Sequence, residues 1–181
     1  IKKILNNNVV ITTNYQMEEI IVMGKGLAYG KQAGDNIDMN KINKTFEVSL
    51  KPSQRKMINM LKDIPLEYME ISDCVIKEAK VDLEVDDSLY ISLTDHIHTS
   101  IERYKEGVYL KNHMLFEIKN FYPKEFELGL LTLELIKEKY GINMEEDEAA
   151  FLALHIVSSE VGRNISDIYE MTNFILEIIG I

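Results

Sequence analysis

The stretch EEDEAAFLALHIVSSEVG, residues 145–162, carries the clearest signal for the fold. Its acidic residues come first, where the positive end of a helix dipole favours them, and an apolar run follows. Gly162 is well placed to end such a helix. We therefore predict a helix over 145–161, with helical character continuing on both sides of it.

The chain between residue 53 and this helix also has a helical pattern. Apolar residues recur at helical spacing, while Pro123 suits a helix start and Gly141 a helix stop. The predicted helices cover residues 53–64, 66–83, 89–105, 111–121 and 123–140. About five helices would form an antiparallel bundle. A last apolar helix is predicted over 166–179. It would extend away from the bundle and have little to pack against.

The N-terminal part of the chain has a strand pattern instead. Residues 9–13, 18–23 and 45–48 are rich in β-branched side chains, and turn signals lie between them. The predicted fold class is therefore multi-domain: a small all-β N-terminal domain followed by an all-α five-helix bundle. A sheet of about 50 residues buries little apolar area alone, so we expect it to dimerise face to face.

The net charge of −10 conceals a division between these parts. Residues 1–52 hold seven lysines and five acidic residues, whereas residues 53–181 hold 13 basic and 25 acidic residues. Such an asymmetry is typical of segments with different partners. The weakly basic first segment favours a nucleic-acid partner that the whole-chain charge would have argued against.

Composition excludes several classes of protein. The one cysteine, Cys74, excludes an internal disulfide framework and a cysteine-based zinc ribbon, and it fits a reducing compartment. The longest apolar runs are much shorter than the roughly 20 residues of a membrane span. The start of the chain does not resemble a signal peptide. We expect a cytoplasmic chain with no membrane insertion.

Two short motifs in the first segment could contact RNA. The amides of Asn6-Asn7-Asn8 can read base edges or cap a turn. In Gly24-Lys25-Gly26-Leu27-Ala28-Tyr29, the lysine offers a phosphate contact and the tyrosine a stacking surface. Taken alone, the asparagines are better explained as a polar turn before a strand, and the second motif also fits a plain hairpin turn with a core tyrosine. Together with the basic charge, they favour RNA binding.

All histidines fall in the helical part, at positions 96, 98, 113 and 155. On a helix, His96 and His98 point in different directions and make a poor metal pair, and no further ligand cluster supports a metal centre. His155 lies in an apolar run, where a hydrogen-bonded core histidine is the usual interpretation. His96 has Ser92 and Ser100 one turn away, so its imidazole has room to accept a phosphoryl group.

Four stretches in one order resemble the BglG/SacY family of transcription antiterminators: Asn6–Val10, Val22–Tyr29, Leu93–Ile97 and Glu146–Val157. The resemblance implies a dimerising co-antiterminator RNA-binding domain over residues 1–52. It implies a linker over 53–59, a first regulation domain of the sugar phosphotransferase system (PTS) over 60–165, and a connector over 166–181 to a second regulation domain that this sequence lacks.

The resemblance also implies roles for individual residues. The RNA-facing candidates are Lys3, Asn8, Gly24, Lys25 and Tyr29. His96 and His155 match the two phospho-acceptor positions, and Asp95 matches the residue that orients the first of them. Many relatives have arginine at position 25, so Lys25 keeps the charge without the bidentate fork.

The implied function is that of a regulator and not an enzyme, with no cofactor or metal. A homodimer would bind a leader-mRNA hairpin and prevent terminator formation. A PTS enzyme II sugar permease, with HPr as a further phosphoryl donor, would phosphorylate the histidines and disturb dimerisation. Two alternatives stay open: a phospho-acceptor bundle whose N-terminal sheet binds protein or DNA, and a histidine-dependent metal hydrolase.

Overall fold

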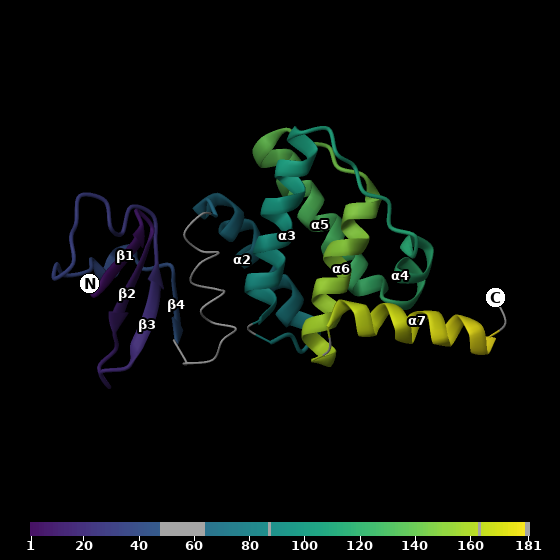
Figure 1. The fold of residues 1–181 in the computed structure, drawn as a ribbon, viewed down its shortest axis with the longest axis horizontal. Coiled ribbons are helices and arrows are strands. Elements are labelled where there is room, and N and C mark those ends of the chain that lie inside the picture. The colour runs from purple at the N-terminus through teal and green to yellow at the C-terminus, as the bar shows by residue number, and fades with distance from the viewer. Residues whose placement is uncertain (48–63, 87, 163, 180–181) are drawn as a thin grey trace. The chain divides into compact units, whose positions relative to one another are not determined.

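The computed structural model describes residues 1–47, 64–86, 88–162 and 164–179. It divides into two compact units, Ile1–Leu66 and Glu67–Ile181 (Figure 1). Strands occur in the first unit and the α-helices fall almost wholly in the second, so the predicted fold class is confirmed. The linker predicted over 53–59, and the helix predicted over 53–64 as far as residue 63, lie outside the described residues.

The first unit contains a four-stranded antiparallel sheet in which neighbours in sequence are neighbours in space. Its strands are β1 (Lys3–Asn6), β2 (Val9–Thr13), β3 (Glu19–Met23) and β4 (Lys44–Glu47). Val10 of β2 pairs with Val22 of β3, and both are buried against Leu27 and Ala28 from the segment after β3. One face of the sheet is therefore covered by a loop from its own unit.

Strand β1 is absent from the sequence-based prediction. Its pattern is weak because Lys3 is exposed, Ile4 is only half-buried, and three asparagines follow from position 6. Its pairing with β2 is also irregular between Ile4 and Asn6. As an edge strand, β1 pairs with one neighbour only. Its extended conformation is held by hydrogen bonds to β2, which the local sequence does not predict.

The second unit is helical. Its elements are α2 (Leu66–Asp82), α3 (Ser88–Lys105), α4 (Leu115–Phe121), α5 (Pro123–Tyr140), α6 (Glu146–Val161) and α7 (Ile165–Ile179). The helices predicted over 66–83, 89–105, 111–121, 123–140 and 145–161 correspond to α2–α6. Helix α4 begins at residue 115 and not 111, because the backbone N–H of Asn112 donates to the carboxylate of Asp147 on α6 instead of entering a helix. No helix among the described residues is long and apolar enough to cross a membrane.

Helix α6 lies at the centre of the bundle, in contact with α3, α4, α5 and α7. Gly129 of α5 makes one of these contacts unusually close, since a Cβ at that position would collide with the carbonyl oxygen of Ala149 on α6. Helix α7 starts against α6 and buries Ile168 and Thr172. The beginning of this last helix is therefore better packed than the sequence suggested.

Candidate functional site

In the first unit, the β1–β2 turn fastens the loop that follows β3. The Oδ1 atom of Asn8 accepts a hydrogen bond from the backbone N–H of Gly26 at 2.8 Å. The backbone carbonyls of Asn8 and Asn7 accept from the N–H groups of Gly24 and Ala28, both at 2.9 Å. The asparagine triplet therefore serves as the scaffold of the 24–29 loop.

The structure explains why glycine occupies positions 24 and 26 of this loop. Gly24 is buried, and a Cβ there would collide with the carbonyl oxygen of Lys41. Gly26 has a φ of 62°, in the left-handed region that glycine adopts without strain. The close backbone approach that Gly24 permits is thus to Lys41 of the same unit.

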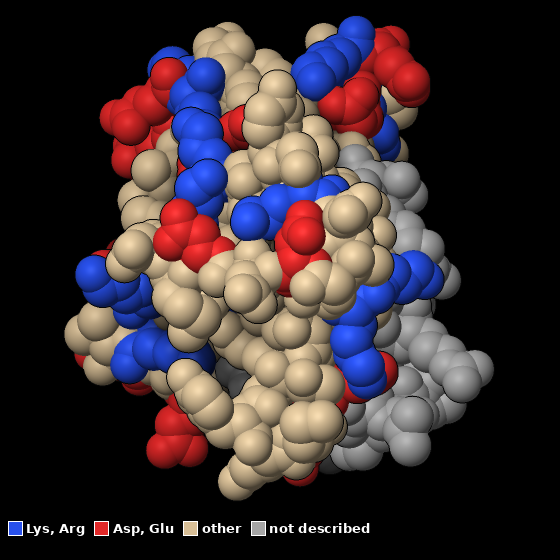
Figure 2. Space-filling model, turned by 90° about the vertical axis from the view of Figure 1, so that its left-hand side faces the viewer, with Lys and Arg blue, Asp and Glu red and all other residues tan. Residues whose placement is uncertain are grey.

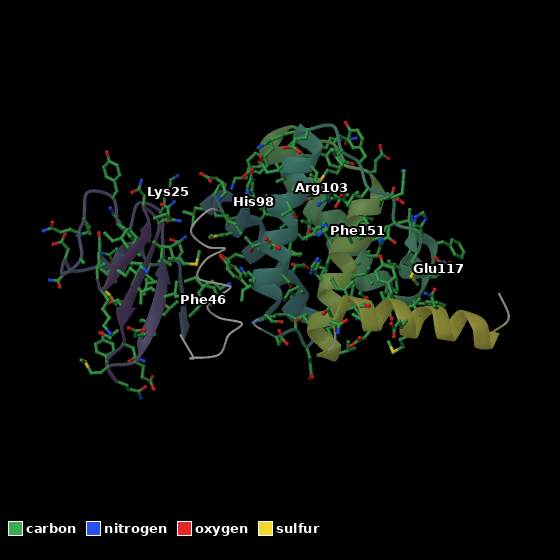
Figure 3. All side chains as sticks on the ribbon, in the orientation of Figure 1. Lys25, Phe46, His98, Arg103, Glu117 and Phe151 are labelled. Carbon is green, nitrogen blue, oxygen red and sulfur yellow. The ribbon has the colours of Figure 1, made fainter. Side chains whose placement is uncertain are left out.

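The loop leaves its lysine and its tyrosine in solvent. Lys25 is exposed, and Tyr29 has 77% of its surface exposed. Lys25 is labelled in Figure 3 at the end of the sheet where the loop lies. Lys3 is also exposed, on β1, opposite Ile11 of β2. The structure thus groups Asn8, Gly24, Lys25 and Tyr29 in one loop assembly, with Lys3 on the neighbouring edge strand.

This exposed surface has chemistry suited to unpaired nucleotides. A free ammonium group can contact a phosphate, and an exposed phenol ring offers a face on which a base can stack. Figure 2 shows Lys and Arg side chains interspersed with Asp and Glu around a mostly uncharged face, and not one continuous basic patch. Specific contacts from the loop, more than bulk charge, would have to supply recognition.

In the second unit, a buried carboxylate joins α3 to α6. Glu148 of α6 is 1% exposed, and its Oε2 atom lies 3.0 Å from Nε2 of His96 on α3. Nη2 of Arg103, also on α3, donates to Oε1 of Glu148 at 2.7 Å. Figure 3 labels Arg103 on α3 and Phe151 on α6, the two helices that form this site.

The two candidate phospho-acceptors lie together. The ring centroids of His96 and His155 are 5.0 Å apart, and those of His96 and Phe151 are 6.0 Å apart. Burial, with a smaller contribution from nearby His96, lowers the pKa of His155 to about 3. His155 is therefore uncharged at neutral pH.

The charges at the site are balanced by direct contacts. Burial opposes ionisation of Glu148, but the hydrogen bonds from His96 and Arg103 outweigh it and hold the pKa of this carboxyl below its usual value. Nε of Arg103 is buried and has no hydrogen-bond partner within the described parts of the chain. Glu148 thus stays ionised between an imidazole and a guanidinium.

Other residues singled out from the sequence lie elsewhere. Among the described side chains, no hydrogen bond joins the carboxylate of Asp95 to His96, whose ring is held by Glu148. His98 packs on Tyr68 of α2, with ring centroids 5.4 Å apart, and His113 is exposed. The described residues contain no group of three or more side chains placed to hold a metal ion.

Sequence reasoning missed Glu148 and Arg103. A signal was available, because Arg103 follows His96 by seven residues and His155 follows Glu148 by seven, which puts each pair on one helix face. What the sequence did not show is that these two faces meet.

Comparison with known proteins finds two families along the chain. Residues 1–55 match the CAT RNA binding domain and residues 69–159 match the PRD domain. Among solved structures, the crystal structure of GlcT CAT-PRDI is similar, with a TM-score of 0.72 and 32% identity. That similarity covers 88% of this chain and 96% of the other.

Curated relatives are similar to this chain along its whole length. It is 42% identical to the transcription antiterminator LicT of Bacillus subtilis (strain 168), and 39% identical to the beta-glucoside operon antiterminator of Dickeya chrysanthemi. Each alignment covers 100% of this chain, but only 66% and 65% of the respective relatives. The chain therefore spans slightly less than two thirds of these relatives.

Proposed function

This chain belongs to the BglG/SacY family of transcription antiterminators, and we propose from that membership that it binds a leader-mRNA hairpin as a homodimer and prevents the overlapping terminator from forming. We assign RNA binding to residues 1–52 and regulation to residues 60–165, with a linker over 53–59 and a connector over 166–181. The family matches over 1–55 and 69–159 support this division. A regulator of nascent transcripts works in the cytoplasm.

The observation that carries the RNA assignment is the 24–29 loop, which hydrogen bonds from the asparagine triplet hold in place and which leaves the side chains of Lys25 and Tyr29 exposed. Lys25 and Lys3 supply phosphate contacts, and Tyr29 supplies a stacking face. Asn8 and Gly24 act mainly by shaping the loop, because the Oδ1 atom of Asn8 is already bound to Gly26 and Gly24 is buried. Unpaired bases in the internal loops of a hairpin are the targets that such groups can reach.

A homodimer doubles this surface. Two copies related by a twofold axis match a hairpin that presents two similar internal loops. Binding both loops at once requires the two RNA-binding domains to stay paired, so anything that separates them weakens binding.

Control comes from phosphorylation of His96 and His155 by a PTS enzyme II sugar permease, with HPr as a second donor. A phosphoryl group adds about −1.5 to −2 charges at neutral pH. It would arrive beside the buried anion Glu148, in a part of the chain that already carries 25 acidic residues against 13 basic ones. We expect this charge to disturb pairing of the helical domains and, through it, pairing of the RNA-binding domains.

The RNA assignment is tested by filter binding with two probes over a salt series. One probe is an RNA hairpin with two internal loops from a sugar-operon leader, and the other is duplex DNA of equal length. We expect tight binding to the hairpin alone. Equal binding to both probes, or none to the hairpin, would support the alternative of a sheet that binds DNA or protein.

The control mechanism is tested with His96→Asp and His155→Asp, which place a permanent charge at each acceptor. His113→Asp is the matched control because His113 is exposed. Sedimentation analysis should show fewer dimers for the first two variants, with weaker RNA binding. Unchanged self-association and RNA affinity would remove the mechanism.

A further inference from the structure

The contact between His96 and Glu148 determines which ring nitrogen carries a proton. An ionised carboxylate can only accept a hydrogen bond, so the nitrogen that faces it must be the one bearing hydrogen. Nε2 of His96 lies 3.0 Å from Oε2 of Glu148. The neutral ring of His96 therefore has its proton on Nε2 and its reactive lone pair on Nδ1.

The carboxylate that imposes this arrangement is fixed. Glu148 is 1% exposed, and Arg103 binds its second oxygen at 2.7 Å. The ring of His155, 5.0 Å from that of His96, is uncharged and offers no competing anion. Among the described residues, Glu148 is the acid in hydrogen-bond contact with the His96 ring.

We propose that Glu148 is the positioning residue for phosphorylation, and that it directs the phosphoryl group to Nδ1 of His96. The proposal rests on the proposed function, in which His96 accepts a phosphoryl group. It deepens that function by naming the acceptor atom and the group that selects it.

The transfer balances without a further reactant. The lone pair of Nδ1 attacks the phosphorus of a phosphohistidyl or phosphocysteinyl donor protein, forming a P–N bond. The donor's P–N or P–S bond breaks, and its electron pair stays on the donor nitrogen or sulfur. The Nε2 proton stays on the ring, which becomes cationic, and the adjacent Glu148 carboxylate stabilises that charge.

The resting state is tested first, without any phosphoryl donor. Long-range proton–nitrogen NMR of the uniformly ¹⁵N-labelled chain distinguishes the two neutral tautomers, and His96→Gln identifies the His96 signals. We expect the Nε2–H form in the unmodified chain. A dominant Nδ1–H form would overturn the inference, whatever the variants do.

The product is tested next, after incubation with phosphoenolpyruvate, enzyme I, HPr and a candidate enzyme II. Phosphorus–nitrogen NMR of the modified chain shows which ring nitrogen bears phosphorus, and we expect Nδ1. Phosphorus on Nε2 overturns the inference while leaving the proposed function intact. Failure of any transfer to His96 counts against both.

Glu148→Gln tests the positioning role, because the amide has the same shape but can also donate to Nε2. We expect mixed tautomers and phosphorylation of His96 slowed roughly 10- to 100-fold, the worth of a hydrogen bond to a charged group. Glu146→Gln is the control, since Glu146 is on the same helix but exposed and paired with Lys119. Equal rates for the two variants contradict the role of Glu148.

Discussion

Removing the side chain of Asn8 would test whether the 24–29 loop, which we propose contacts RNA, depends on the hydrogen bond that holds it in place. In Asn8→Ala, the backbone N–H of Gly26 loses its acceptor at 2.8 Å. A neutral hydrogen bond contributes about 1 kcal/mol, and a half-buried donor left without a partner costs up to about 3 kcal/mol. Lys25 and Tyr29 keep their side chains, but the loop that holds them becomes less ordered.

RNA binding to the variant must supply the free energy of ordering this loop. At 1.4 kcal/mol per factor of ten, a loss of about 1–3 kcal/mol predicts an affinity lowered roughly 5- to 100-fold. Fluorescence anisotropy with a labelled leader hairpin measures the affinity, and urea unfolding followed by far-UV circular dichroism measures stability in parallel.

Asn14→Ala is the matched control. The Oδ1 atom of Asn14 accepts from the N–H groups of Gln16 and Glu18, both at 2.9 Å, in the β2–β3 turn. It should lower stability by a similar or smaller amount and leave RNA affinity within about twofold of the unaltered chain. If Asn8→Ala destabilises the chain but binds RNA as tightly as this control, the loop is not part of the RNA face.

Three more changes have expected outcomes. Lys25→Ala should weaken RNA binding and reduce the slope of log affinity against log salt by about 0.7–0.9, the value of one phosphate contact; an unchanged slope would exclude that contact. Gly129→Ala forces a Cβ onto the carbonyl oxygen of Ala149, so we expect a loss of about 1–3 kcal/mol and a Tm lowered by several degrees in a thermal melt. The third change concerns pH. Because the pKa of His155 falls from 6.5 to about 3 on folding, the unfolded chain binds more protons between these values. Stability should therefore decline as pH falls from about 6.5 towards 3, by up to about 1.4 kcal/mol per pH unit. His155→Gln should make this decline shallower in urea unfolding at several pH values, and an equal slope would contradict burial of a neutral ring.

Local signals predicted the elements whose ends are marked by particular residues. Helix α5 runs from Pro123 to Tyr140 as predicted, because Pro123 fits the first turn and Gly141, with a φ of 69°, ends the helix. Strand β2 also has its predicted bounds, since five consecutive apolar or β-branched residues favour extended backbone. Where a boundary depends on a distant partner, as at Asn112 and Asp147, the prediction was off by four residues.

The same distinction applies to the sites. The histidines and the glycine-flanked lysine stand out in the sequence by residue type and neighbours. Glu148 does not, because its role depends on partners 45 and 52 residues earlier in the chain. The function of Asn8 as a fastener likewise depends on Gly26, 18 residues away. Tertiary pairing of this kind is set by packing and not by local spacing.

The missing side chain at Gly129 has a mechanical consequence for the histidine site. It seats the backbone of Ala149 directly on α5, and Ala149 is the residue next to Glu148. The backbone that carries Glu148, whose carboxylate binds His96, therefore has little room to shift relative to α5. We expect charge added at His96 to be accommodated by rotation of side chains or by movement of α6 as a unit, and the second would reach α3, α4, α5 and α7, which contact α6.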